Sequence, residues 1–379
     1  MSFDTESEPK LLNDNDAISS ILIRLPLKTL IQCKLVCKWW HNLISDPVFI
    51  ATYSRRNPQH YVSGFYLQKF LLLKLYSELE FFPYEGNHDA APKPSLSFIE
   101  DNNGVCIRDS CNGLLLCSSF RCSNEEERKY YICQPTTKQY FSLPKPPCEK
   151  VVAINIVCNL KRSPYYQVVC ICDSKTLPNF KYCEVKIYHS RTRSWRDSGN
   201  PCIIKDDILF ERGIYSNGAI HWVGRGEKSL RFDVENELMH WIPMPAIKDG
   251  WTERRIGYFG ESRGNLYLIE NYGPCSSTFD VMEMKMDYSS WTLKYHVDLQ
   301  SLILQRFNVL QIVHEKVGEK YEPLMVLKGQ GNFMLYNMRE NGIMKLSYST
   351  FPVKDVGDSN GLWYNWEAVF PYTNSLWYI

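Results

Sequence analysis

Two patterns of hydrophobic positions divide this chain of 379 residues. From residue 13 to residue 53 the apolar side chains recur every three or four positions, which is the spacing of one face of an α-helix. From about residue 96 to the end, short apolar runs alternate with polar turns, which is typical of β-strands. We therefore expect a small helical domain followed by a mainly β domain, in an α+β multidomain protein.

Proline and capping residues divide the helical part into three predicted helices. Pro26 ends the first helix, because proline has no amide hydrogen to donate and crowds the preceding turn. A second helix is predicted from about residue 27 to residue 44. The sequence Ser45-Asp46-Pro47 has the form of a cap followed by proline at the first helical position, and it opens the third helix.

Each predicted helix has one apolar face. The residues on these faces are Ile18, Ile21, Leu22 and Leu25 in the first helix, Leu30, Val36, Trp40, Leu43 and Ile44 in the second, and Val48, Phe49 and Tyr53 in the third. Domains below about 40 residues usually need a disulfide, a metal or a partner to fold. The apolar faces must therefore pack against the rest of this chain or against another protein.

The β part repeats about every 50 residues, with turns near residues 112, 163, 217, 264 and 320. Four-stranded propeller blades recur at about 40 to 50 residues. We predict five whole blades and a sixth blade divided between the two ends of the domain, so about six in all. Strands at 363–370 and 375–379 would pair with strands near 61–67 or 96–108, and this pairing would close the ring.

These patterns predict four regions along the chain. Residues 1–12 are a polar tail without periodicity, which we expect to be disordered. Residues 13–56 form the helical domain. Residues 57–95 form a linker with the first strand or strands, and its apolar run at 70–82 is compatible with a strand or a helix. Residues 96–379 form the propeller.

Composition excludes several classes of partner. There are 43 basic and 42 acidic side chains, so the chain lacks the basic excess typical of nucleic-acid-binding proteins. No run of about 18 apolar residues occurs, so we expect no membrane span. The N-terminal residues are polar and have no apolar segment typical of a signal peptide. We therefore expect an intracellular protein of the cytoplasm, the nucleus or both.

The fourteen cysteines are predicted to be buried free thiols. No Cys-x-x-Cys pair occurs, and the closest spacings are Cys170-Ile171-Cys172 and Cys33 with Cys37. In a strand, Cys170 and Cys172 point to the same face, as apolar side chains would. A structural zinc site needs four convergent ligands, commonly in close pairs. We therefore expect no metal ion and no cofactor.

Motifs of catalysis are missing from the sequence. It contains no Gly-x-Ser-x-Gly turn, no His-Glu-x-x-His pair and no Gly-x-x-x-x-Gly-Lys-Ser/Thr loop. His221 lies beside Trp222 in a predicted inner strand, where a core or channel-lining position is expected. The charged run at residues 125–129 is predicted to be a solvated hairpin tip. No catalytic residue is therefore assigned.

Residues of the helical part match a known motif in order and spacing. They are Ile21-Leu22-Ile23-Arg24-Leu25-Pro26, Leu27-Lys28-Thr29-Leu30, Val36-Cys37-Lys38-Trp39-Trp40 and Leu43-Ile44-Ser45-Asp46-Pro47-Val48-Phe49. Through them the segment resembles the F-box, the adaptor-binding motif of cullin-type ubiquitin ligases, in its plant form. The family usually begins with Leu-Pro eight residues before the position of Ile21, where this chain has Asn13-Asp14, preceded by Leu11-Leu12.

This resemblance implies that the apolar face binds a Skp-family adaptor and, through it, a cullin. The residues assigned to the adaptor contact are Ile18, Ile21, Leu22, Leu25, Pro26, Leu30, Val36, Trp40, Ile44, Pro47 and Phe49. The first contact of the motif is absent in this chain or is made by Leu11 or Leu12.

The β part carries a second resemblance. The residues that carry it are Ser110-Cys111-Asn112-Gly113-Leu114-Leu115, Gln134-Pro135-Thr136-Thr137-Lys138, Ser216-Asn217-Gly218-Ala219-Ile220-His221-Trp222 and Phe232-Asp233. This part is similar to the C-terminal domain of plant F-box proteins, of the F-box-associated, kelch-like type. The two resemblances together imply a non-catalytic, substrate-recognition subunit of a cullin-type (SCF) ubiquitin ligase, in which the propeller holds a target protein.

Two other functions remain compatible with the sequence. A propeller lectin or an oxidase-like enzyme would carry the helices as an appendage, and the oxidase would need Tyr, His and Cys ligands that converge on the propeller axis. Alternatively, an F-box protein could act outside any ligase as a scaffold. Binding of the Skp-family adaptor, metal content and binding to a glycan array distinguish these functions.

Overall fold

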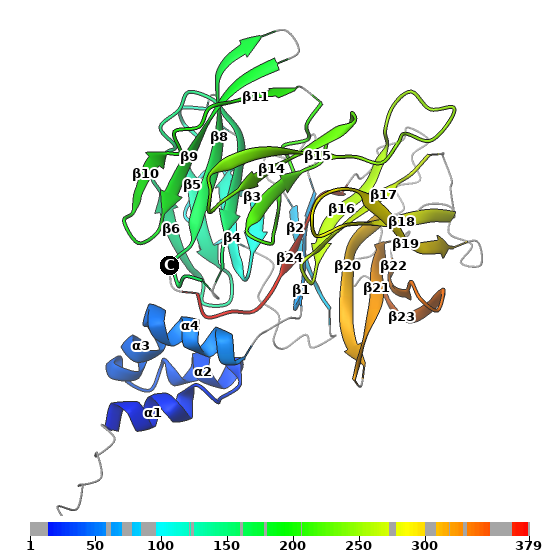
Figure 1. Cartoon of the computed structure of the whole chain (residues 1–379). Coiled ribbons are helices and arrows are strands. Elements are labelled where there is room, and N and C mark those ends of the chain that lie inside the picture. Colours follow the sequence, from blue (N-terminus) through cyan, green and yellow to red (C-terminus); the bar gives the residue numbers. More distant parts are fainter. Residues whose placement is uncertain are drawn as a thin grey trace, which may run out of the picture.

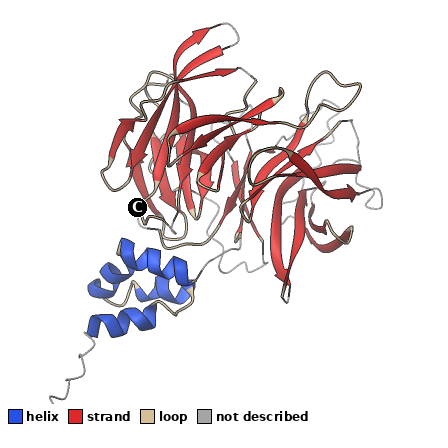
Figure 2. Ribbon diagram, viewed as in Figure 1, coloured by secondary structure: helices blue, strands red, loops and turns tan. Residues whose placement is uncertain are grey.

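The computed structural model describes most of the chain. The described residues are 14–57, 62–69, 78–84, 96–120, 122, 125–159, 162–177, 180–205, 207–272, 278–299, 308–317, 319–328, 332–348 and 366–377. Figures 1 and 2 show a small group of helices beside a larger domain built from strands. Residues 1–13 lie outside the described residues. They include the predicted tail at 1–12, with Leu11 and Leu12, and Asn13 of the position where the F-box family usually has Leu-Pro.

The helical domain contains four helices, where the sequence had predicted three. They are α1 (Asp14–Leu22), α2 (Leu27–Cys33), α3 (Lys38–Ser45) and α4 (Pro47–Arg56). None of the helices in the described part of the chain is long and apolar enough to span a bilayer.

The predicted second helix is wrong in its length, because a turn at residues 34–37 divides it. The amides of Lys34, Leu35 and Val36 each donate to the carbonyl three residues earlier, which tightens the end of α2. Cys37 is extended, with φ −160° and ψ 165°, and its sulfur accepts a hydrogen bond from the Trp40 amide at 3.4 Å. One extended residue is thus enough to start a new helix in a new direction.

The predicted start of the last helix is confirmed. The Asp46 carboxylate accepts hydrogen bonds from the amides of Val48 at 2.8 Å and Phe49 at 3.1 Å. Pro47 occupies the first helical turn, where its missing amide hydrogen removes no helical hydrogen bond. A side-chain cap of this kind is worth about 1 kcal/mol.

The strands form six antiparallel sheets, which are the blades of a propeller, and the predicted blade number is therefore confirmed. Blade 1 contains β3 (Val105–Cys111), β4 (Leu114–Ser119), β5 (Tyr130–Gln134) and β6 (Gln139–Leu143). Blade 2 contains β7 (Val151–Val157), β8 (Gln167–Leu177), β9 (Phe180–His189) and β10 (Ser194–Asp197), with β11 (Cys202–Lys205) also paired to β9. Blade 3 contains β12 (Ile214–Ser216), β13 (Ala219–Trp222), β14 (Lys228–Asp233) and β15 (Leu238–Pro243).

The remaining blades complete the ring. Blade 4 contains β16 (Ile256–Ser262), β17 (Asn265–Glu270), β18 (Thr278–Met284) and β19 (Trp291–Asp298). Blade 5 contains β20 (Asn308–Val317), β21 (Lys320–Lys328), β22 (Asn332–Asn337) and β23 (Gly342–Tyr348). Blade 6 contains, in spatial order, β2 (Glu78–Pro83), β1 (Gly64–Lys69) and β24 (Trp366–Tyr372).

Blade 6 joins the two ends of the propeller. β24 pairs with β1 from Gly64 opposite Tyr372 to Lys69 opposite Trp366. β24 in turn contacts β3 of blade 1, so the last strand closes the circle (Figure 1). The predicted strand at 375–379 is wrong for residues 375–377, which have no regular structure, and residues 378–379 lie outside the described part. The apolar run at 70–82 contains β2 in the portion that the structure describes.

The core consists of six apolar clusters, one at each interface between neighbouring blades. Tyr66 and Tyr372 of blade 6 pack with Leu115 of blade 1, and Ile156 of blade 2 packs with Ile132 of blade 1. The four other interfaces are built in the same way, between blades 2 and 3, 3 and 4, 4 and 5, and 5 and 6. Each blade is therefore buried by its neighbours, which is why the ring must close.

Three hairpins share a turn with two consecutive left-handed residues. They are Asn112-Gly113, Asn217-Gly218 and Arg263-Gly264, each between the first and second strand of its blade. This backbone is a type I′ turn, for which Asn-Gly is the preferred sequence. The Asn112 side chain also donates to the Cys158 carbonyl at 2.7 Å, and Asn217 donates to the Gly264 carbonyl. Each asparagine thus ties its own blade to the next.

Asp109 is expected to make the propeller less stable as the pH rises from about 4 to about 7. Its carboxylate accepts hydrogen bonds from the Asn155 side chain at 3.0 Å and the Ile156 amide at 2.9 Å, across the interface between blades 1 and 2. Burial outweighs these hydrogen bonds and raises the pKa of Asp109 to about 7. The folded protein therefore holds this proton more tightly than the unfolded chain, whose ordinary pKa is near 4.

The sign of the effect follows from proton linkage. The stabilisation is complete below about pH 4 and is lost as the pH rises through about 7. We expect Asp109→Asn, which cannot ionise, to remove this part of the pH dependence. The measurement is the free energy of unfolding of both proteins at several pH values between 4 and 8. Parallel curves for the two proteins would contradict the assignment to Asp109.

Candidate functional site: the helical surface and the two propeller faces

The helices are held together by a compact apolar cluster. Its buried members are Leu22, Ile23, Leu30, Ile44, Phe49, Ile50, Tyr53 and Leu376. Four of the residues that the sequence assigned to adaptor binding, Leu22, Leu30, Ile44 and Phe49, therefore lie inside the helical domain. Their assignment to a direct adaptor contact stays a prediction. Periodicity marks a helical face as apolar but does not tell which protein covers it.

A second group of apolar side chains lies on the outside of the helices. Of the assigned residues, Ile21 is 62% exposed, Val36 is 63% exposed and Pro26 is also exposed. Three further residues, which the sequence reading did not assign, are Leu35 at 87%, Trp39 at 38% and Val48 at 67%. Large apolar residues with this exposure, gathered in one small domain, are typical of a surface that meets another protein. We call these six residues the helical apolar surface.

The other assigned residues lie between these two groups. Ile18, Leu25 and Trp40 are partly buried against the helical cluster, and Pro47 is partly buried at the start of α4. The loop between α1 and α2 is held by α4, because the Tyr53 hydroxyl donates to the Leu25 carbonyl at 3.0 Å. This bond holds Pro26 in place at the surface.

The charge of the helical domain is positive. Residues 14–57 contain six basic side chains and three acidic ones, a formal net charge of +3. The exposed basic residues are Arg24, Lys28, Lys38, Arg55 and Arg56. A partner that binds the helical apolar surface would therefore bind more strongly if acidic side chains surrounded its own contact area.

A C-terminal segment, residues 373–377, connects the helices to blade 1. Leu376 packs into the helical cluster, whereas Trp377 packs into the cluster between blades 1 and 2. The Gln134 side chain donates to the Ser375 carbonyl at 2.5 Å, and the Asn374 amide donates to the Ser63 hydroxyl at 3.0 Å. In Figure 1 this red segment runs from β24 to the helices. We call it the C-terminal strap.

The strap places the helices on one face of the propeller. It passes Gly113, in the turn between β3 and β4, and Tyr372 accepts a hydrogen bond from the Thr136 amide, in the turn between β5 and β6. In an antiparallel blade these two turns lie at the same end, which we call the turn face. The connections from second to third strands, and from one blade to the next, lie at the opposite end. This loop face is free of the helices (Figure 1).

The loop face of blade 1 has a polar hollow. Its volume is about 460 Å³, and it is lined by Asn103, Glu126, Glu127, Arg128, Lys129, Tyr130, Ser142, Leu143 and Lys145. The predicted hairpin tip at 125–129 is thus part of this hollow, and Arg128 pairs with Glu125 at 2.8 Å within it. Sequence reasoning missed the hollow because its lining comes from three separate loops and strands.

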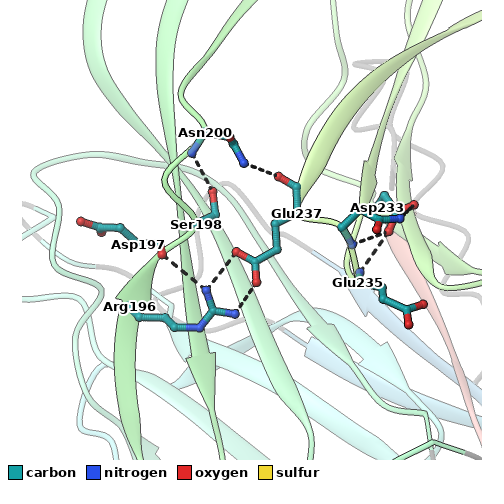
Figure 3. A network of polar contacts seen from close by, with 8 residues as sticks. Arg196, Asp197, Ser198, Asn200, Asp233, Glu235 and Glu237 are labelled. Atoms are coloured by element: carbon teal, nitrogen blue, oxygen red, sulfur yellow. Dashed lines mark hydrogen bonds and ion pairs between the residues drawn. The ribbon is translucent and has the colours of Figure 1, made fainter.

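A network of charged residues joins blades 2 and 3 (Figure 3). Arg196 at β10 donates two hydrogen bonds to Glu237 in the turn between β14 and β15, one of them at 2.9 Å. Asn200 donates to the Glu237 carbonyl at 3.3 Å, and Asp233 accepts from the amides within that turn. Because these pairs are largely exposed, each contributes little to stability. They connect the segment at and after β10 with the β14–β15 turn of the next blade.

His221 lies in the core, as expected for a residue beside Trp222. Its side chain is buried, one ring nitrogen lies 3.2 Å from the Ile214 carbonyl, and the other lies 3.1 Å from the Tyr288 hydroxyl. Burial lowers the pKa of His221 to about 4, so the ring is neutral at pH 7. These contacts occupy both nitrogens and leave no position for a substrate.

Comparison with known protein families agrees with this architecture. Residues 89–313 match the family described as "F-box protein At3g26010-like, beta-propeller", and residues 15–55 match the F-box-like domain. The first match covers more than half of the chain. The kelch-like character suggested by the repeat stays a prediction, because the matched description names only a beta-propeller.

Individual relatives come from Arabidopsis thaliana. The F-box protein At5g07610 is 29% identical over 99% of this chain and 94% of its own length. The F-box protein At5g49610 is 27% identical over 71% of this chain and 72% of its own length, and At5g03970 is 23% identical over 98% and 90%. The chain therefore belongs to the At3g26010-like beta-propeller family of F-box proteins, with an F-box-like domain at its N-terminus.

Proposed function

We propose that this chain is the substrate-recognition subunit of a cullin-type (SCF) ubiquitin ligase. An F-box joined to a propeller implies a substrate-recognition adaptor. In the proposal, the helices bind a Skp-family adaptor, the adaptor binds a cullin, and the propeller binds a target protein. The observation that carries the proposal is the helical apolar surface, which the propeller leaves uncovered.

The positions of the helices and of the loop face support separate binding sites for the adaptor and the target. The helices occupy the turn face at blade 1, so a target held on the loop face would not compete with the adaptor. A negative rim on the adaptor would match the excess of basic residues on the helices. The polar hollow of blade 1 is a recess on the loop face that would receive a side chain of the target.

The mechanism needs no catalytic residue in this chain. Two binding sites on one rigid protein raise the local concentration of target lysines near the ubiquitin-loaded enzyme. The C-terminal strap contributes the rigidity, since it packs into both the helical cluster and the propeller core. The oxidase-like alternative gains no support from the described residues, because the group of His, Cys, Asp or Glu side chains that lie close enough there to share a metal ion consists of three cysteines.

A cross-linking experiment tests both parts of the proposal. The tagged full chain is captured from cells in which ligase activity is blocked, and cross-linked lysines are identified by mass spectrometry. We expect the Skp-family adaptor and a cullin in stoichiometric amounts, and target cross-links at Lys129, Lys145 and Lys248 of the loop face. Lys138 and Lys285, in turns of the opposite face, serve as internal controls. Capture without the adaptor would overturn the ligase assignment, and target cross-links confined to the control lysines would overturn the loop face.

A further inference from the structure

Three cysteine sulfurs from two separate segments meet at the loop-face end of blades 1 and 2. The sulfur atoms of Cys148, Cys170 and Cys172 all lie within 4.8 Å of one another. Cys170 and Cys172 project from the same face of β8 and are 3.7 Å apart. Cys148 comes from the connection between β6 and β7. The spacing in the sequence relates Cys170 to Cys172, but it does not show that Cys148 joins them.

This cluster differs from ordinary packing of thiols in the same protein. Cys117 and Cys133, on neighbouring strands, also lie close together, at 3.8 Å, and both pairs belong to apolar clusters between blades. No third thiol joins Cys117 and Cys133 among the described residues. Cys148 is partly exposed, whereas Cys170 and Cys172 are buried.

The connection that carries Cys148 is fixed at both ends. The Trp195 side chain donates to the Pro144 carbonyl at 2.7 Å, and the Cys148 amide donates to the Pro146 carbonyl at 2.8 Å. After Cys148, Lys150 pairs with Asp173 at 3.1 Å, and the Asp173 amide donates to the Lys150 carbonyl. The fold therefore holds the third sulfur over the other two without help from a ligand.

We propose that Cys148, Cys170 and Cys172 bind a thiophilic metal ion, Zn²⁺ or Cu⁺, through three thiolate sulfurs. Thiolates select these ions over hard cations. Zinc–sulfur bonds of about 2.3 Å place neighbouring sulfurs roughly 3.7 to 4 Å apart, close to the separation of Cys170 and Cys172. Zn²⁺ would take a water molecule as its fourth ligand, whereas Cu⁺ would be satisfied by the three sulfurs.

The bound ion would fasten the connection between blades 1 and 2 to β8. Lys145, which lines the polar hollow, belongs to this same connection. Metal binding would therefore stabilise the loop face beside the hollow. The proposal does not depend on the ligase assignment, because the cluster lies in the propeller and away from the helices.

Metal uptake by the reduced full chain tests this proposal. Co²⁺ serves as a spectroscopic probe, and Zn²⁺ and Cu⁺ are titrated separately with competing chelators. We expect one equivalent of metal, a cobalt–thiolate charge-transfer band, and a higher unfolding temperature with the preferred ion. Cys148→Ser should weaken binding at least about 100-fold, because loss of an outer-shell partner alone costs 10- to 100-fold.

The matched control is Cys202→Ser, which removes another partly buried thiol outside the cluster. It should bind metal as the unchanged protein does, and circular dichroism should show that both variants are folded. Uptake of one ion and not the other supports the site and identifies its metal. The proposal is overturned if the unchanged protein binds none of the three ions, or if Cys148→Ser binds as tightly as Cys202→Ser.

Discussion

Replacing Val36 by aspartate should weaken binding of the Skp-family adaptor at least about 30-fold and leave the propeller folded. Val36 is 63% exposed in the turn between α2 and α3, beside Leu35 at 87%. An exposed carboxylate at this position does little to the free protein, but in the complex it would be buried without a partner. Loss of a central contact typically costs about 2 kcal/mol or more, roughly a 30-fold weaker affinity. Calorimetric titration with the purified adaptor measures the effect.

Two further variants separate surface from core. Met286→Asp introduces the same charge at a propeller residue that is 67% exposed, and it should bind the adaptor normally. Leu30→Ala removes a fully buried side chain and should cost about 2 to 5 kcal/mol of stability, with lost helicity. Normal affinity of Val36→Asp would show that the adaptor binds elsewhere on the helices.

Replacing Gly113 by alanine should release the C-terminal strap. Gly113 has φ +89°, and an added Cβ would lie 2.2 Å from the Ser375 hydroxyl and 2.4 Å from the Thr373 carbonyl. Gly218 occupies the same turn position in blade 3, with φ +81° and no atom within 4 Å. Both alanine variants bear the left-handed strain of about 1 to 2 kcal/mol. Only the change at Gly113 also displaces the strap.

The difference between the two variants isolates the strap. Because Leu376 and Trp377 would leave their clusters, we expect Gly113→Ala to lose at least about 3 kcal/mol more than Gly218→Ala. Thermal unfolding measures the difference, and hydrogen exchange at residues 373–377 shows whether the strap has opened. Equal losses in the two variants would mean that the strap contributes little.

The strap has a functional consequence within the proposed ligase. The helices and the propeller share no sheet, so the relative orientation of adaptor and target depends on contacts such as those of Leu376. A released strap should leave adaptor binding intact and lower the rate at which the target receives ubiquitin. This result would distinguish loss of positioning from loss of binding.

Some features of the fold could be predicted from the sequence because they depend on residues that are close together in the chain. Asn112-Gly113 and Asn217-Gly218 predict tight hairpin turns from residue type alone, and their spacing predicts the blades. The same holds for the cap at Asp46 and Pro47. The break of the second helix was also visible in principle. In a continuous helix the step of six residues from Leu30 to Val36 rotates by about 600°, which places the two side chains on different faces.

The sequence by itself determined the helical domain, the six-bladed ring and the closure of that ring by its two ends. These follow from local periodicity and from the need of each apolar face to be covered. Only the tertiary structure decided that Leu30 is buried while Val36 is exposed, that Leu376 reaches the helices, and that Cys148 joins Cys170 and Cys172. The physical reason is that periodicity marks a side chain as apolar or polar, whereas its burial and its contacts depend on which distant segment docks against it.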